Sequence, residues 1–237
     1  MITKFEWLHY SLKNLSFTMI SKNTFRFLKT LSENNNREWF EKHKPEYQII
    51  QSEFKETLEE LVFEMSKFDN TLLNVDVSKS IFRIYRDVRF SKDKTPYKTN
   101  MGAWINKGGK NSVYAGYYLH LQPGGNSFAA AGCYFPDAET LKKLRQEIDY
   151  SSNAFKKILN EKKLKETFGE LSNFKLKTNP KGYDPTNPMI EYLKQKSFIV
   201  SKQMKDIEIS KQDFIQSLSD IYKTAHPLVQ FLNKALE

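Results

Sequence analysis

The sequence has one cysteine, Cys133, and four histidines among its 237 residues. A single cysteine cannot form an intramolecular disulfide or a multi-cysteine zinc site, and it is typical of a reducing compartment. The histidines show no HExxH or other paired-ligand spacing, which argues against a metal enzyme. Walker, GxGxxG and GxSxG motifs are absent as well. We therefore expect no cofactor and no metal.

Long apolar runs are also lacking. No stretch approaches the roughly 18 apolar residues that span a bilayer. Residues 1–20 intersperse Lys4, Glu6, His9 and Lys13 among apolar residues, and they contain neither an apolar signal core nor a small-residue cleavage site. These absences predict a cytoplasmic protein that does not enter a membrane.

Positive charge, in contrast, is plentiful. Lys and Arg number 37 against 28 Asp and Glu, which gives a net charge of +9. More than half of this excess lies within residues 79–98, where seven Lys and Arg accompany only Asp87 and Asp93. So dense a cationic segment favours an anionic partner or serves solubility.

Hydrophobic periodicity predicts several helices. Apolar side chains indicate a short helix over residues 21–31 and a longer one from Pro45 to about Lys67, with Pro45 in its first turn. Further helices are expected after the capping residues Asp137, Ser151 or Ser152, and Ser210–Asp213, with a break at His226–Pro227.

Alternation with a period of two predicts a strand over residues 82–90, with Arg86 on its apolar side. A charge there needs a buried partner from elsewhere in the chain, such as Glu53, Glu60 or Asp184. Three more strands are expected near 101–106, 113–121 and 127–135, and short ones around Phe174 and Phe198. The pattern predicts an α+β fold in which a single antiparallel β-sheet, a meander of four or more strands, packs against a long N-terminal helix and C-terminal helices.

The strongest candidate for a binding site is the cationic stretch that begins at Arg83. Arginine binds an anion in bidentate fashion, lysine adds a point charge, and Thr and Tyr donate hydrogen bonds. The candidate ligand-binding residues are Arg83, Arg86, Arg89, Lys92, Lys94, Thr95, Tyr97 and Lys98. The alternative is an exposed basic turn with one arginine in a structural role.

The segments RDVRFSKDKTPYKTN, NNNREWFEKHKPEY and PKGYD resemble a family of uncharacterised bacterial and fungal proteins that carry a domain of unknown function. The resemblance spans roughly Asn23 to Leu232. It implies a single α+β domain, for which we expect residues 19–237, with residues 1–18 as an N-terminal extension, and it implies no established reaction. Family members commonly have a histidine where this chain has Asn187, so a mechanism that uses that histidine as a base is not expected here.

The resemblance also draws the PKGYD segment into the candidate site. Lys181, Tyr183 and Asp184 lie in a Pro/Gly turn, and their cation, phenol and carboxylate would complete the basic site from a distant part of the chain. Without the resemblance they form an ordinary turn.

A second feature is a sheet face on which Gly102, Gly116, Ala130 and Gly132 share their phase with aromatic residues. This face provides a surface for a ligand ring, or it lets a helix pack closely on the glycines. His120 is the only histidine of the strand block, and no carboxylate is evident that would orient it as a general base. We expect a hydrogen-bonded or exposed imidazole.

The favoured function is binding of a small phosphate- or carboxylate-bearing molecule at the basic segment, with or without its chemical conversion. One alternative is a nucleic-acid-binding module that uses the same cations and exposed aromatic rings, and another is a protein-interaction domain without a small ligand. For the favoured function we expect only weak nucleic-acid binding, which disappears near physiological salt.

Overall fold

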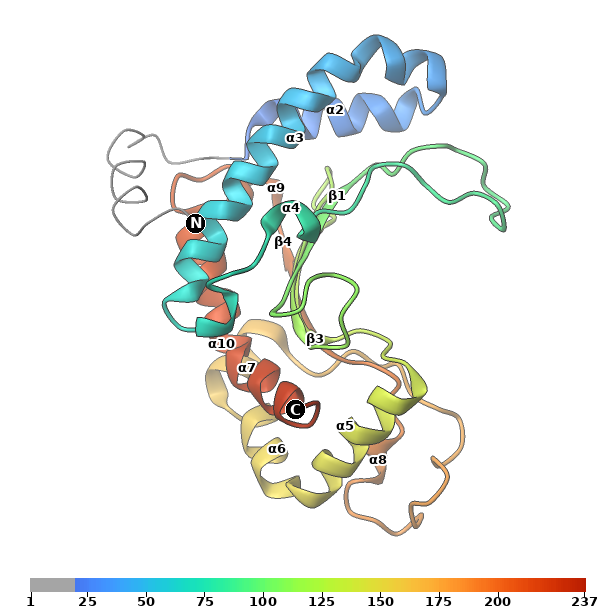
Figure 1. Cartoon of the computed structure of the whole chain (residues 1–237), viewed down its shortest axis with the longest axis vertical. Coiled ribbons are helices and arrows are strands. Elements are labelled where there is room, and N and C mark those ends of the chain that lie inside the picture. The colour runs from blue at the N-terminus through green and yellow to red at the C-terminus, as the bar shows by residue number, and fades with distance from the viewer. Residues whose placement is uncertain (1–19) are drawn as a thin grey trace.

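The computed structural model describes residues 20–237, so the expected N-terminal extension lies outside the described residues. The described chain forms one antiparallel sheet with the strand order β1-β2-β3-β4 (Figure 1). The first three strands follow one another along the chain, whereas β4 joins β3 after several helices. The strands are β1 (Met101–Ile105), β2 (Gly116–Leu121), β3 (Ser127–Cys133) and β4 (Phe198–Met204). The predicted α+β class with a single antiparallel sheet is confirmed.

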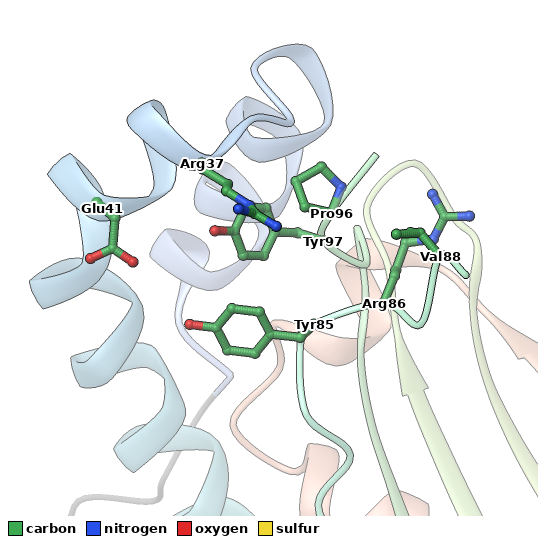
Figure 2. A pocket seen from close by; sticks show the side chains of 7 residues that line it. All are labelled: Arg37, Glu41, Tyr85, Arg86, Val88, Pro96 and Tyr97. Carbon is green, nitrogen blue, oxygen red and sulfur yellow. The ribbon is translucent and has the colours of Figure 1, made fainter. Parts of the chain in front are cut away.

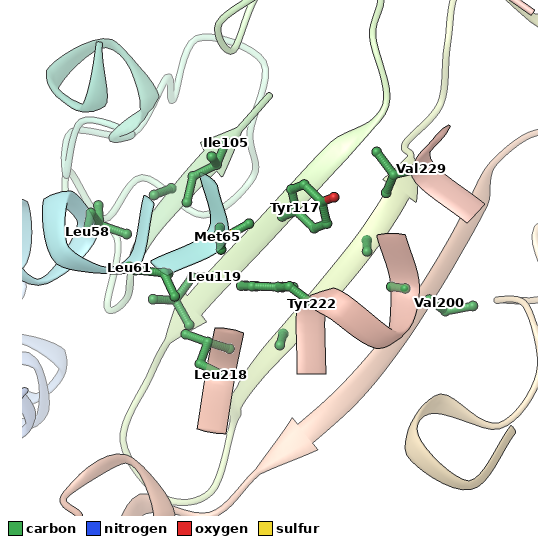
Figure 3. Packing of buried hydrophobic residues seen from close by; sticks show 14 of the residues in the cluster. Leu58, Leu61, Met65, Ile105, Tyr117, Leu119, Val200, Leu218, Tyr222 and Val229 are labelled. Atoms are coloured by element: carbon green, nitrogen blue, oxygen red, sulfur yellow. The ribbon is translucent and has the colours of Figure 1, made fainter. Parts of the chain in front are cut away.

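One face of the sheet carries the helical layer. It consists of α3 (Arg37–Ser66) and α10 (Phe214–Lys234), and α2 (Lys22–Glu33) packs on α3. Alternate residues of β2, namely Tyr117, Leu119 and Leu121, are fully buried. Figure 3 shows Tyr117 and Leu119 among side chains such as Leu61 of α3 and Tyr222 of α10. The predicted packing of a long N-terminal and a C-terminal helix on the sheet is confirmed.

The long helix α3 begins at Arg37, well before the predicted start at Pro45. Asn36 caps it by accepting the backbone N–H of Trp39 at 2.9 Å. Phe40 is fully buried and stacks on Tyr97 with ring centroids 4.0 Å apart. Because this packing stabilises the first turns, the helix continues through a proline that removes one backbone donor.

The helix α10 likewise continues through Pro227, so the predicted break is wrong. Leu228, Val229 and Leu232 behind the proline are buried, and burying this face outweighs the lost hydrogen bond. The cap predicted within Ser210–Asp213 is wrong as well, because Asp213 precedes the helix and its side chain makes no capping hydrogen bond.

Shorter elements complete the fold. Asp137 caps its helix as predicted, by accepting the N–H of Thr140 at 2.8 Å. Within residues 20–237 no helix is long and apolar enough to cross a membrane. The short elements are the 3₁₀ helix η1 (Asn70–Leu72) and the helices α4 (Val77–Ser80), α5 (Ala138–Tyr150), α6 (Ser152–Leu159), α7 (Lys162–Phe168), α8 (Ile190–Leu193) and α9 (Asp206–Ile209).

The strand predicted over residues 82–90 is not formed. This segment meets the returning chain at an isolated bridge between Tyr85 and Tyr97. Beyond the bridge, Pro96 has no N–H to continue a ladder, and Asp93 bends the chain by accepting a backbone N–H. The chain from Tyr85 to Tyr97 therefore forms a two-sided loop that projects from the molecule (Figure 1), which we call the basic arm.

Candidate functional site

The tip of the basic arm is held by its own side chains. Arg86 Nη1 donates to Asp93 Oδ2 at 2.6 Å and to the carbonyl and hydroxyl oxygens of Thr95. Arg89 pairs with Asp87 through two hydrogen bonds of 2.9 and 2.6 Å. The prediction that Arg86 pairs with a buried carboxylate from elsewhere in the chain is therefore wrong. Its partner is Asp93, which belongs to the same loop.

The tip also carries two lysines, and one of them bonds to the arm itself. Lys94 Nζ donates to the carbonyl of Val88 at 2.9 Å, and Lys92 is exposed. Most cations of the arm thus satisfy oxygen atoms of the arm itself. Their first role is to give a projecting loop a defined shape.

The base of the arm is fastened to the start of α3. Asn35 Nδ2 donates to the carbonyl of Tyr97 at 2.9 Å, and the N–H of Tyr97 donates to Asn35 Oδ1 at 3.1 Å. Tyr97, a predicted ligand residue, is buried here with its ring against Phe40. The neighbouring pocket of about 310 Å³ is lined by the residues in Figure 2, where Tyr85 and Tyr97 turn their hydroxyls toward α3.

Two lysines lie over the ring of Phe82, which is held beside β1 by the hydrogen bond from its N–H to the carbonyl of Gly102. Lys98 Nζ lies 5.4 Å and Lys110 Nζ 5.8 Å from the centre of the Phe82 ring, and Arg83 is the next residue in the chain. Burial, together with the charges of Arg83 and Lys110, lowers the pKa of Lys98. Among the described residues, no carboxylate lies within 4.0 Å of these three cationic groups. We call Phe82, Arg83, Lys98 and Lys110 the Phe82 cluster.

A pocket of about 380 Å³ adjoins this cluster. Lys110 is fixed at its edge by donating Nζ to the carbonyl of Ile81 at 2.9 Å. Amide, hydroxyl and cationic donors therefore meet around one pocket, which is the donor set that a phosphate or carboxylate needs. The lining residues are Gln48, Gln51, Ser52, Lys55, Ser78, Ile81, Phe82, Arg83 and Lys110.

The sheet face opposite α3 and α10 carries a hydrogen-bonded pair next to the Phe82 cluster. Tyr118 Oη lies 3.1 Å from His120 Nδ1, and His120 Nε2 lies 3.0 Å from Gln122 Oε1. The Tyr118 ring meets Phe82 edge-on at 6.1 Å. Burial lowers the pKa of His120, and it raises the pKa of Tyr118 to about 12, so both are neutral at pH 7. His120 is thus hydrogen-bonded, and an amide rather than a carboxylate orients it.

The small residues of this face make room for their neighbours within the sheet. A Cβ on Gly102 would lie 2.7 Å from the hydroxyl of Tyr118, and one on Gly132 would lie 2.0 Å from the carbonyl of Phe198. Gly132 also has φ of +128°, which disfavours any other residue. The glycines therefore accommodate a tyrosine ring and a strand backbone, and α3 and α10 pack on the other face.

The PKGYD turn lies at the opposite end of the molecule from the arm (Figure 1). Lys181 is exposed, Asp184 accepts the N–H and hydroxyl of Thr186, and Tyr183 has its pKa raised by burial and by Asp149. The structure does not bring these residues to the basic segment.

Asn187 has a structural role beside that turn. Its Nδ2 donates to Asp149 Oδ1 at 2.8 Å, and its Oδ1 accepts the N–H of Met189 at 2.7 Å. The side chain thus ties α5 to the segment that leads into α8.

Comparison with known proteins gives one positive result. Residues 23–231 match the model of a family described as "Conserved hypothetical protein (DUF2461)". The chain belongs to this family. No curated protein and no solved structure matches it. Family membership therefore names a domain of unknown function, and any inference about ligands rests on the site itself.

Sequence reasoning found part of the Phe82 cluster. Arg83 and Lys98 are among the predicted ligand residues, whereas Lys110 is not. The only feature in the sequence that could have pointed to Lys110 is its position in a glycine-rich turn next to an edge strand. Its distance of 28 residues from Phe82 in the sequence hides their contact.

Proposed function

We propose that the protein binds a small phosphate- or carboxylate-bearing molecule at the Phe82 cluster, with its anionic group held by Arg83, Lys98 and Lys110. The observation that carries this proposal is that Lys98 and Lys110 both lie over the Phe82 ring, with Arg83 close enough to Lys98 to act on its pKa. Their repulsion contributes to the lowered pKa of Lys98, and no carboxylate of the described chain offsets it within 4.0 Å. An anion would relieve that repulsion.

The shape of the site favours a small ligand over a nucleic acid. A bound strand is tracked by cations spread along a groove, with aromatic rings for the bases. Here Arg86, Arg89 and Lys94 of the arm are engaged with oxygen atoms of the arm. Two cations of the cluster that have no ion pair among the described residues, Arg83 and Lys110, line one pocket, which suits one anionic group.

We also propose that the protein works in the cytoplasm, and the free cysteine Cys133 supports this because it fits a reducing compartment. Burial raises the pKa of its thiol to about 12, so the side chain is an inert apolar residue.

The proposal is tested by calorimetric titration of the protein with inorganic phosphate and, separately, with citrate at about 150 mM salt. Lys98→Met should weaken binding by about tenfold to a hundredfold, since a hydrogen bond to a charged group contributes about 1.5–3 kcal/mol. Lys92→Met removes the same charge from the tip of the arm and should leave the affinity within about twofold.

Two results would overturn this assignment. One is an equal loss in Lys92→Met, which would move the site to the arm. The other is tight retention of a single-stranded oligonucleotide at about 200 mM salt, because binding through many phosphates falls steeply with salt whereas one anionic group loses little.

A further inference from the structure

The pocket beside the Phe82 cluster lies between two walls of different chemistry. One wall is α3, and the other consists of α4, residues 81–83 and the hairpin turn between β1 and β2. Figure 1 shows α4 between α3 and β1, and it packs on both. The α3 wall contributes Gln48, Gln51, Ser52 and Lys55, and the opposite wall contributes Ser78, Ile81, Phe82, Arg83 and Lys110.

The α3 wall is a polar stripe with little net charge. Its residues are three or four positions apart, so they lie on one face of the helix. Lys55, the cation of the stripe, pairs with Glu59 at 3.5 Å. Among residues 20–237, no hydrogen bond engages the side-chain amide of Gln48 or Gln51. Both amides are therefore available to a ligand.

Side-chain amides of this kind match hydroxyl groups better than they match an anion. A glutamine side chain both donates and accepts, as a hydroxyl group does, whereas an ionised carboxylate only accepts. The amide oxygens are used only if the ligand brings donors of its own. No carboxylate is among the described residues that line the pocket, so nothing there favours an ammonium group as that donor.

The opposite wall sets the charge of the ligand. Arg83 and Lys110 line it, and neither has an ion pair within the described chain. Lys110 Nζ donates to the carbonyl of Ile81 at 2.9 Å, which leaves two of its three donors for a ligand. Two positive charges match a phosphate monoester, which carries about −1.5 to −2 at pH 7, more closely than they match a single carboxylate.

The rest of the ligand is small. The pocket volume of about 380 Å³ is near the lower end of the range of about 300–1,000 Å³ for small-molecule sites. Phe82 is the aromatic residue of the lining, and Lys98 and Lys110 already lie over its ring. Because a nucleobase stacks on an open aromatic ring, the pocket suits a sugar or polyol better than a nucleotide.

We infer that the ligand of this pocket is the phosphate monoester of a small sugar or polyol. This inference rests on the proposed function and names its class of ligand. The phosphate lies against Arg83 and Lys110, and hydroxyl groups of the ligand bond to the amides of Gln48 and Gln51 across the pocket.

The test compares ligands by calorimetric titration at about pH 7.5 and about 150 mM salt. At least one of glycerol 3-phosphate, ribose 5-phosphate and glucose 6-phosphate should bind about tenfold more tightly than inorganic phosphate, because its hydroxyl groups add hydrogen bonds. Glucuronate presents similar hydroxyl groups with a carboxylate, and it should bind about tenfold more weakly than the best of these esters. Adenosine monophosphate should also bind more weakly than that ester.

The double variant Gln48→Leu/Gln51→Leu removes both amides from the α3 wall and keeps residues that favour a helix. It should weaken binding of the best ester about tenfold and leave the affinity for inorganic phosphate within about twofold. The matched control is Gln216→Leu/Gln230→Leu, because both glutamines are exposed on α10 and neither lines the pocket. The control should leave both affinities unchanged, whereas Arg83→Met should weaken both ligands alike.

The inference is overturned, and the proposed function stands, if none of the three esters binds more tightly than inorganic phosphate. The same conclusion follows if the double variant loses inorganic phosphate as strongly as the ester, if glucuronate binds as tightly as the best ester, or if adenosine monophosphate binds most tightly. If none of these anions binds, the proposed function fails and the inference fails with it.

Discussion

Asp69 lies buried behind the sheet, in a network with Tyr117 and His226. Tyr117 Oη donates to Asp69 Oδ2 at 2.9 Å and lies 2.7 Å from His226 Nδ1, and His226 is 3.5 Å from the same carboxylate oxygen. Burial on its own raises the pKa of Asp69, but hydrogen bonds from His226, Thr71 and Tyr117 outweigh it and lower the pKa to about 2. The charge of Asp69 therefore ties η1, β2 and α10 together.

This lowered pKa predicts a pH dependence of stability. The group contributes about 2 kcal/mol above its ordinary pKa of 3.8, and the contribution is lost as the pH falls toward 2. In Asp69→Asn the free energy of unfolding at pH 7 should fall by about that amount, and the gap to the unaltered protein should narrow below pH 4. Urea unfolding between pH 2 and 7 measures it.

Asp220→Asn serves as the control, because Asp220 is exposed on α10 and should change stability little at any pH. A gap between Asp69→Asn and the unaltered protein that stays constant down to pH 2 would contradict this account of Asp69.

Among the elements, the basic arm departs most from its sequence pattern. The alternation of Phe82, Ile84, Val88 and Phe90 is that of a half-buried strand, yet Phe90 is 95% exposed at the tip. Alternation reports which side chains share a face only where a neighbouring strand pairs with the segment, and Pro96 prevents that pairing. Strands β1 to β3 have paired neighbours, and there the same rule predicted the elements correctly.

The role of Arg86 follows from this difference. Arg86→Met releases Asp93 and Thr95, so amide hydrogen exchange across residues 88–95 should rise about tenfold from the loss of roughly 1–1.5 kcal/mol of local hydrogen bonding. The melting temperature should fall by less than about 2 °C, because the arm contributes little to the core.

Asn35→Ala is the complementary variant, since it frees the base of the arm instead of its tip. It should raise exchange over the whole arm and around Tyr97. A drop in the melting temperature of Arg86→Met by several degrees would contradict the local role of Arg86 and restore a partner in the core.

At the scale of the whole molecule, the sequence predicts the layers better than the site. Hydrophobic periodicity predicts the long helix and the strands of the meander, and the structure buries Leu61 of that helix together with Tyr117 and Leu119 of β2 and Tyr222 of α10. A site depends on how elements meet. Lys110 reaches Phe82 from a hairpin turn, and no local pattern encodes that contact.

The PKGYD turn is a second case in which residue types alone do not locate the site. Its residue types suit an anion site as well as those of the Phe82 cluster do, yet the fold places it at the far end of the molecule (Figure 1). Residue types alone therefore nominate more anion-binding residues than the fold places at one site.

The most direct test of the central claim is a map of backbone amide chemical shifts, recorded while inorganic phosphate is added at constant ionic strength. Binding at the Phe82 cluster predicts that the largest changes fall on Phe82, Arg83, Lys98, Gly102 and Lys110, that they saturate, and that the tip of the arm from Asp87 to Lys94 stays unchanged. Changes that centre on the tip, or that spread evenly over the exposed lysines without saturating, would contradict the claim.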